Sequence, residues 1–116
     1  MRQSSSTSPA LFHHAARDAI KAFPPDVRRS VGKVIWDLQR GARLAMPLSR
    51  PMPAVGRGVQ ELRIKDPAGA FRVFYCLVTI AGVLVIHAFQ KKSQQTPRRE
   101  IELAQKRLQE LLDEST

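Results

Sequence analysis

Residues 83–108, VLVIHAFQKKSQQTPRREIELAQKRL, carry the side chains of this chain that are best suited to chemistry. An apolar run ends there in a polar turn that contains His87, Phe89, Lys91 and Lys92. A phosphate-bearing ligand could use all four groups, because the ammonium groups neutralise charge, the aromatic ring stacks on a base and the imidazole moves a proton. The spacing therefore predicts a phosphate site where a strand ends.

Two further cations, Arg98 and Arg99, follow the same turn, next to Pro97, where the last helix is expected to begin. The N-terminus of a helix favours anions. A pair such as Lys91-Lys92 is by itself most often a solvated turn. Its coincidence with a helix start and a second basic pair favours an anion site.

Arg63 and Arg72 are expected on two adjacent strands that are joined by a short turn. Arg63 alternates with Leu62 and Ile64, so it projects from the face opposite to theirs. If the two arginines pair across the turn, their guanidinium groups could bind a phosphate bidentately and stabilise charge that develops on its oxygens. The alternative is a pair of solvated charges on the sheet, with Glu61 as an ion-pair partner.

Tyr75 and His87 lie in the apolar strands and have two interpretations each. Tyr75 could stack on a base or donate a proton, or it could pack in the core with a tethered hydroxyl group. Strand alternation puts it on the face opposite to Arg72. His87 shares a face with Phe89, but a lone histidine in an apolar strand is often a core residue. With no Cys, Asp or second His at ligand spacing from His87, a metal site is not expected.

The composition sets the class of protein. A chain of 116 residues supports one domain, and its net charge of +9 favours a polyanion or an acidic protein as partner.

Cys76 is the single cysteine, so a reducing cytosol is the simplest compartment, and its apolar neighbours predict a buried side chain. Residues 73–89 lack charge, but they fall short of the roughly 20 residues that a membrane span needs. The pair His13-His14 is expected on the surface.

The elements that must position these residues follow from periodicity. Residues 1–9 are rich in serine and are expected to be flexible, while residues 10–116 form a single domain. Helical spacing predicts one helix over residues 10–23 and a second from Pro25 or Asp26 to Arg40, with Gly41 as its stop. Residues 42–58 contain several prolines and glycines and are expected to be an extended connection.

The second half of the chain predicts three strands and a helix. Residues 59–65, 71–79 and 83–89 read as strands, with turns at 66–69 and 81–82. The last helix begins near Pro97 with Thr96 as its cap. The expected fold class is α+β, with two N-terminal helices, an antiparallel sheet of three or four strands and a C-terminal helix, all helices packing on one face. An N-terminal strand is only weakly indicated.

Several segments in order resemble a known family: Glu61-Leu62-Arg63, residues 69–75 (GAFRVFY), residues 87–97 (HAFQKKSQQTP), and residues 100–104 (EIELA) with Arg107-Leu108. This series resembles the phage-derived, HigB-like branch of the RelE/ParE toxin superfamily. The resemblance covers about residues 20–112, and the block at 87–97 is its most specific part. The first ten residues depart from the family, whose members usually begin with a clear strand.

The resemblance implies a small RelE-like fold with helices on a curved antiparallel sheet, and a toxin of a type II toxin–antitoxin pair. Such toxins cleave mRNA, commonly on the ribosome, by attack of a 2′-hydroxyl group on the adjacent phosphate, without a metal or cofactor. By analogy, Arg63 and Arg72 would hold the phosphate, and Lys91 or His87 would transfer the proton. The remaining candidates for RNA or phosphate binding are Lys65, Tyr75, Phe89, Lys92, Arg98 and Arg99.

The expected partners are mRNA and a cognate antitoxin of the helix-turn-helix type, in the cytoplasm and without a membrane. Two other functions stay open at this point. One is a non-enzymatic toxin of the ParE kind, which inhibits DNA gyrase by binding. The other is an accessory protein that binds nucleic acid. His87 and the pair Lys91-Lys92 favour RNA chemistry, while the lack of an obvious nucleophile–base pair keeps the non-enzymatic function open.

Overall fold

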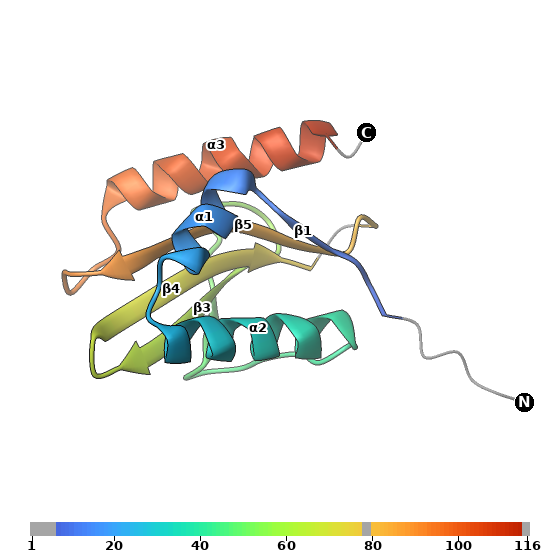
Figure 1. Ribbon diagram of the computed structural model, residues 1–116. Coiled ribbons are helices and arrows are strands. Elements are labelled where there is room, and N and C mark those ends of the chain that lie inside the picture. Colours follow the sequence, from blue (N-terminus) through green and yellow to red (C-terminus); the bar gives the residue numbers. More distant parts are fainter. Residues whose placement is uncertain (1–6, 78–79, 115–116) are drawn as a thin grey trace, which may run out of the picture.

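The computed structural model describes residues 7–77 and 80–114 of the chain (Figure 1). Its elements are, in chain order, β1 (Ala10–Phe12), α1 (His14–Lys21), α2 (Pro25–Gln39), β2 (Ser49–Pro51), β3 (Val59–Asp66), β4 (Gly69–Cys76), β5 (Val83–Lys91) and α3 (Arg98–Glu114). The five strands form one sheet in the order β1-β5-β4-β3-β2. β1 is parallel to β5, and the other neighbours are antiparallel.

The sheet lies between two helical layers, so the prediction that all helices pack on one face was wrong (Figure 1). One core, which includes Val73 and Tyr75 of β4, packs against α1 and α2. A second core, which includes Phe74 and Cys76 of the same strand, packs against α3. The cause is that β4 and β5 are apolar on both faces, and a fully buried Val, Leu, Ile or Phe side chain stabilises the fold by about 1.5–3 kcal/mol.

The central elements agree with the sequence predictions. α2 begins at Pro25, buries Val27, Val31 and Ile35, and is followed by Gly41 at φ 101°, where glycine is favoured. β3 and β4 form the expected hairpin over the turn at residues 66–69. Cys76 is buried, as predicted. The last two residues of the predicted strand 71–79 and the first six of the predicted flexible segment lie outside the described residues.

The N-terminal segment is the main departure from prediction. Residues 10–12 form β1 and do not belong to the first helix, because they pair with residues 83–85 of β5. The Val83 amide donates to the Pro9 carbonyl at 2.9 Å, and a Cβ atom on Gly82 would lie 2.3 Å from that oxygen. Ser8 is also bonded, since its amide donates to the Gln39 carbonyl at 2.8 Å. Glycine at position 82 therefore lets β1 approach the sheet.

Two short features shape the region of interest. β2 forms within the predicted extended connection, with Ser49 opposite Leu62 of β3. In β5 the register shifts, so that Phe74 pairs with His87 while Tyr75 pairs with Val85. The residue between, Ile86, is the extra residue of a β-bulge. Within residues 7–77 and 80–114, the structure contains no helix with the length and apolar character of a membrane span.

Candidate phosphate-binding site

Three rows of side chains cross β3, β4 and β5 on the sheet face that α3 covers. Because directly paired residues share a face, the register defines these rows as Glu61–Phe74–His87, Arg63–Arg72–Phe89 and Lys65–Ala70–Lys91. The first row lies in the interior, with all three side chains buried. The third row holds two lysines on either side of Ala70, whose small side chain leaves space between them. The cationic side chains of the second and third rows therefore gather at one end of this face, beyond the buried first row.

This end of the sheet is hollowed. A depression of about 640 Å³ lies over Ala70 and is lined by Arg63, Ala70, Arg72, Lys91, Lys92, Ser93 and Gln94. Four of these residues are cations, and none is a carboxylate. The structure thus brings together the two predicted arginines and the predicted lysine pair, as an anion site requires.

Arg63 and Arg72 are direct cross-strand partners. Arg72 is 5% exposed, and its Nη1 donates to the Phe71 carbonyl at 3.2 Å. The Nε atoms of both arginines are buried and have no hydrogen-bond partner among the described residues. A buried guanidinium N–H without an acceptor is costly, since buried polar groups are nearly always bonded. An anion in the hollow would offset the positive charge of the two guanidinium groups.

Glu61 is the counter-charge of this arrangement. Its side chain is fully buried and accepts hydrogen bonds from Arg50 Nε at 2.8 Å and from Thr96 Oγ1 at 3.2 Å. Its Oε2 lies 3.8 Å from Arg72 Nε. Burial lowers the pKa of Arg72, and the charge of Glu61 acts in the opposite direction. Thr96 was predicted to cap the last helix, but its hydroxyl group donates to Glu61. This bond ties the segment just before α3 to the site.

Lys91 has an altered acidity. Its pKa lies below the usual value, first because burial disfavours the ammonium form and then because Arg72 is a nearby positive charge. Glu61 opposes this shift. A lysine with a lowered pKa is neutral in a larger fraction of molecules at neutral pH, and the neutral amine accepts a proton. Among the residues that line the hollow, Lys91 is therefore the candidate for proton transfer.

His87 does not line the hollow. It is 3% exposed, its Nε2 lies 2.7 Å from Glu100 Oε1, and its Nδ1 accepts from the Arg107 guanidinium. Burial lowers its pKa, an effect that the bond to Glu100 opposes. The expected pairing with Phe89 exists, with ring centroids 5.4 Å apart, but both rings are buried. His87 links β5 to α3, which matches the alternative of a satisfied core histidine.

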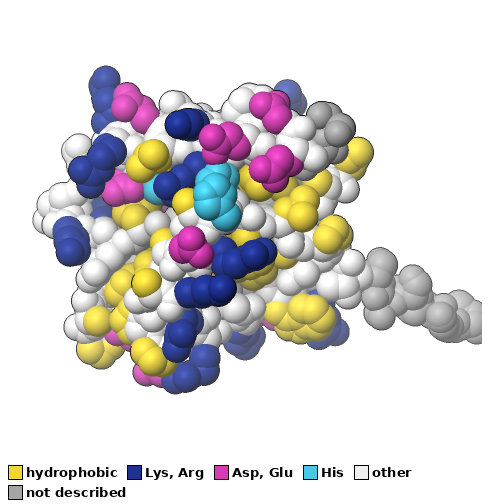
Figure 2. Space-filling model, turned by 45° about the horizontal axis from the view of Figure 1, so that its top comes forward, with side chains coloured by type: hydrophobic (Ala, Val, Ile, Leu, Met, Phe, Trp, Pro, Cys, Tyr) yellow, Lys and Arg dark blue, Asp and Glu magenta, His cyan; other side chains and the backbone are white. Residues whose placement is uncertain are grey.

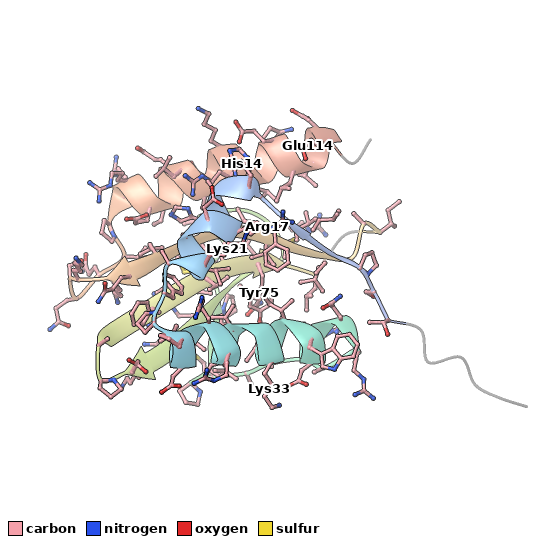
Figure 3. All side chains as sticks on the ribbon, in the orientation of Figure 1. His14, Arg17, Lys21, Lys33, Tyr75 and Glu114 are labelled. Atoms are coloured by element: carbon pink, nitrogen blue, oxygen red, sulfur yellow. The ribbon has the colours of Figure 1, made fainter. Side chains whose placement is uncertain are left out.

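Tyr75 lies on the other face of the sheet from Arg72, as strand alternation predicted. Figure 3 shows it on the side that α2 covers, where it belongs to the same core. It is 2% exposed, its hydroxyl group lies 2.6 Å from Ser49 Oγ, and burial raises its pKa. Tyr75 is therefore not among the residues that the structure brings together, because the sheet itself lies between its side chain and the cations.

The remaining candidates lie around the hollow. Lys65 borders an adjoining depression together with Arg63 and Arg72. Arg99 is exposed and borders a smaller depression of about 250 Å³ that also contains Lys92. Arg98 borders a separate depression beside Glu102, away from the arginine pair. The basic pair at the start of α3 is therefore divided between two surfaces.

Sequence reasoning missed two sets of residues. Pro47 and Leu48 border the depression next to the arginine pair, and no motif marks them. His13, expected on the surface, is 6% exposed, with Nε2 2.6 Å from Glu110 Oε1 and Nδ1 accepting from the Ala15 amide. Its position directly before α1 is the signal of a helix cap. Figure 2 shows the surface around α1 and α3, where acidic and basic side chains alternate.

Comparisons with known proteins agree with this fold. The family model of the phage-derived protein Gp49-like (DUF891) matches residues 18–109. A chain of the toxin–antitoxin complex RelBE2 from Mycobacterium tuberculosis superposes with a TM-score of 0.51 at 16% identity, over 79% of this chain and 100% of that one. No curated protein matches the chain. The family match covers most of the sequence and bears out the resemblance: the chain belongs to the phage-derived Gp49-like family, a family of RelE/HigB-type toxins.

Proposed function

We propose that this RelE-type toxin is a metal-independent mRNA endonuclease whose phosphate site consists of Arg63, Arg72, Lys91 and Lys92. One observation carries the proposal. Two directly opposed guanidinium groups have buried Nε atoms that find no hydrogen-bond partner in the described part of the chain, and the hollow beside them is lined by cations and by no carboxylate. Such a set of donors is preorganised for a phosphate whose charge grows during reaction.

The reaction that fits this site is an internal transesterification. The 2′-hydroxyl oxygen attacks the adjacent phosphorus, the bond from phosphorus to the 5′-oxygen breaks, and the products are a 2′,3′-cyclic phosphate and a 5′-hydroxyl end. Arg63 and Arg72 donate to the non-bridging oxygens and orient the phosphate. The neutral amine of Lys91 takes the proton of the 2′-hydroxyl group, and the Lys92 ammonium gives a proton to the leaving oxygen.

Lys91 fits the base role better than His87 does. A general base must reach the proton that it removes. The imidazole of His87 is buried, and both of its nitrogens are engaged by residues of α3. Lys91 borders the hollow that Arg63 and Arg72 also border. The lowered pKa of Lys91 supports the same assignment.

The proposed partners are mRNA on the ribosome and an antitoxin of the helix-turn-helix type. The net charge of +9 favours an acidic partner segment over the hollow. The solved structure with the similar fold belongs to a toxin–antitoxin complex, which supports an antitoxin for this chain as well.

The test uses purified protein and single-stranded RNA in excess chelator, with and without translating ribosomes. Wild type should leave 2′,3′-cyclic phosphate ends, and a 2′-deoxy substitution at the cleaved position should block the reaction. Arg72→Ala should lose cleavage, while Arg29→Ala, an exposed cation of α2 that pairs with Asp26, should retain it. Intact RNA in both conditions, from a protein that still arrests growth, would favour a toxin that acts by binding.

A further inference from the structure

Three consecutive apolar residues lie exposed next to the arginine pair. Met46 is 58% exposed and Leu48 is 37% exposed, with Pro47 between them. Together with Lys65 and the two arginines, Pro47 and Leu48 line a depression of about 340 Å³. Exposed apolar clusters of this kind mark binding surfaces more often than chance.

The backbone holds this turn in a fixed place. The Arg63 amide donates to the Leu48 carbonyl at 2.8 Å, and the Ser49 amide donates to the Ala45 carbonyl at 3.1 Å. Ser49 is also the first residue of β2, which pairs with β3. The apolar wall is therefore anchored to the strand that carries Arg63, and its position relative to the arginines is set before any ligand binds.

The arginine pair separates two depressions of different character. Arg63 and Arg72 border both the cationic hollow with Lys91 and Lys92 and the depression with the apolar wall. Every charged group that lines the apolar depression is a hydrogen-bond donor. A nucleotide has the complementary distribution: an anionic phosphate joined to a flat base with apolar faces and acceptor atoms on its edge.

We infer that the depression formed by Pro47, Leu48 and Lys65 binds the nucleobase next to the phosphate held by Arg63 and Arg72. The inference rests on the proposed function, because it needs a nucleic acid phosphate at the arginine pair. The volume lies within the roughly 300–1,000 Å³ of small-ligand sites. Bases of single-stranded RNA bind by stacking on side chains and guanidinium planes. Leu48 supplies the wall, and the arginines anchor the nucleotide at its phosphate.

The test is a double-mutant cycle between the protein and the base. The probe is a short, fluorescein-labelled 2′-O-methyl RNA, which cannot be cleaved, and its abasic versions lack one base each. For wild type, removal of one particular base should weaken binding at least about tenfold. Leu48→Ala should weaken binding of the intact probe similarly, and the abasic change should then have no further effect. Leu48→Met should restore binding, and Leu11→Ala, an equally exposed leucine on β1, should leave it unchanged.

The outcomes separate this inference from the proposed function. If Arg72→Ala abolishes binding but Leu48→Ala weakens intact and abasic probes equally or not at all, the base site is wrong and the phosphate site stands. If wild type binds no probe, either free or presented on ribosomes, both proposals are wrong. If Leu48→Ala affects only capture of the antitoxin, the apolar wall serves a protein, and the base site is also wrong. Circular dichroism and the Tm of each variant show whether it is folded.

Discussion

Arg63 and Arg72 are placed directly opposite each other on β3 and β4, each with a buried Nε atom that lacks a hydrogen-bond partner within residues 7–77 and 80–114. Like charges at directly opposed sheet positions destabilise a fold. Here the fully buried Glu61, one row along the same face, lies 3.8 Å from Arg72 Nε and offsets part of that cost. The fold thus holds two cations together that an anion would stabilise.

The hollow depends on the small side chain of Ala70, which lies between Lys65 and Lys91 in the third row. We expect Ala70→Leu to fill this space and to weaken RNA binding about tenfold or more, although no charge is changed. Ala70→Ser should bind like wild type. The measurement is anisotropy of a labelled 2′-O-methyl RNA at constant salt. Unchanged affinity in the leucine variant would place the RNA elsewhere.

The pH dependence of cleavage distinguishes the two roles open to Lys91. As a general base, its neutral form is active, so the rate should rise with pH as the pH approaches the lowered pKa of Lys91. As a cation that only neutralises phosphate, it would lose activity over the same range. Single-turnover rates of wild type and Lys91→Arg decide between them. The arginine variant should lack the rise, and Lys33→Arg on α2 should keep it.

Glu61 should affect stability and binding in opposite directions. Glu61→Gln leaves Arg72 without its counter-charge, and removal of one partner of a buried ion pair costs about 3–5 kcal/mol. Loss of a negative charge beside the hollow should at the same time strengthen phosphate binding. Urea unfolding gives the first quantity, and titration with the uncleavable RNA gives the second. A variant that is destabilised and also binds more weakly would show that Glu61 acts only by shaping the site.

His87 should make the stability of the fold depend on pH. Its folded pKa is lowered, mainly by burial, below the unfolded value of about 6.5. The unfolded chain therefore binds the proton first as the pH falls. The stabilisation is fully present above about pH 6.5 and is lost as the pH falls toward the folded pKa. His87→Gln should be less stable at neutral pH and should show a flatter decline in acid, measured by urea unfolding. A parallel decline in both proteins would contradict this assignment.

Local patterns predicted the elements that carry the site. The alternation in β3 correctly placed the Arg63 side chain on the other face of the sheet from Leu62. The turn at residues 66–69 brought Arg63 and Arg72 into register. α2 followed from its apolar stripe and from Pro25. In these elements the local sequence and the tertiary contacts favour the same structure.

The remaining features depend on contacts between distant residues. β1 and β2 have three residues each, and their pairing with strands far along the chain decides that they form. His13 bonds to Glu110, which is 97 residues away, and no local pattern contains that contact. His87 appeared suitable for catalysis because the sequence does not reveal that α3 covers its ring. The wall formed by Pro47 and Leu48 likewise depends on where β2 attaches.

The most direct test of the account is to induce the protein in a bacterial host and to map mRNA 5′ ends across the transcriptome. Wild type should create new 5′-hydroxyl ends within coding regions. Arg72→Ala should create none, and Arg29→Ala should reproduce the wild-type map. Growth arrest with intact mRNA, or cleavage that persists in a folded Arg72→Ala protein, would contradict the claim that the Arg63–Arg72 pair is the phosphate site of a ribonuclease.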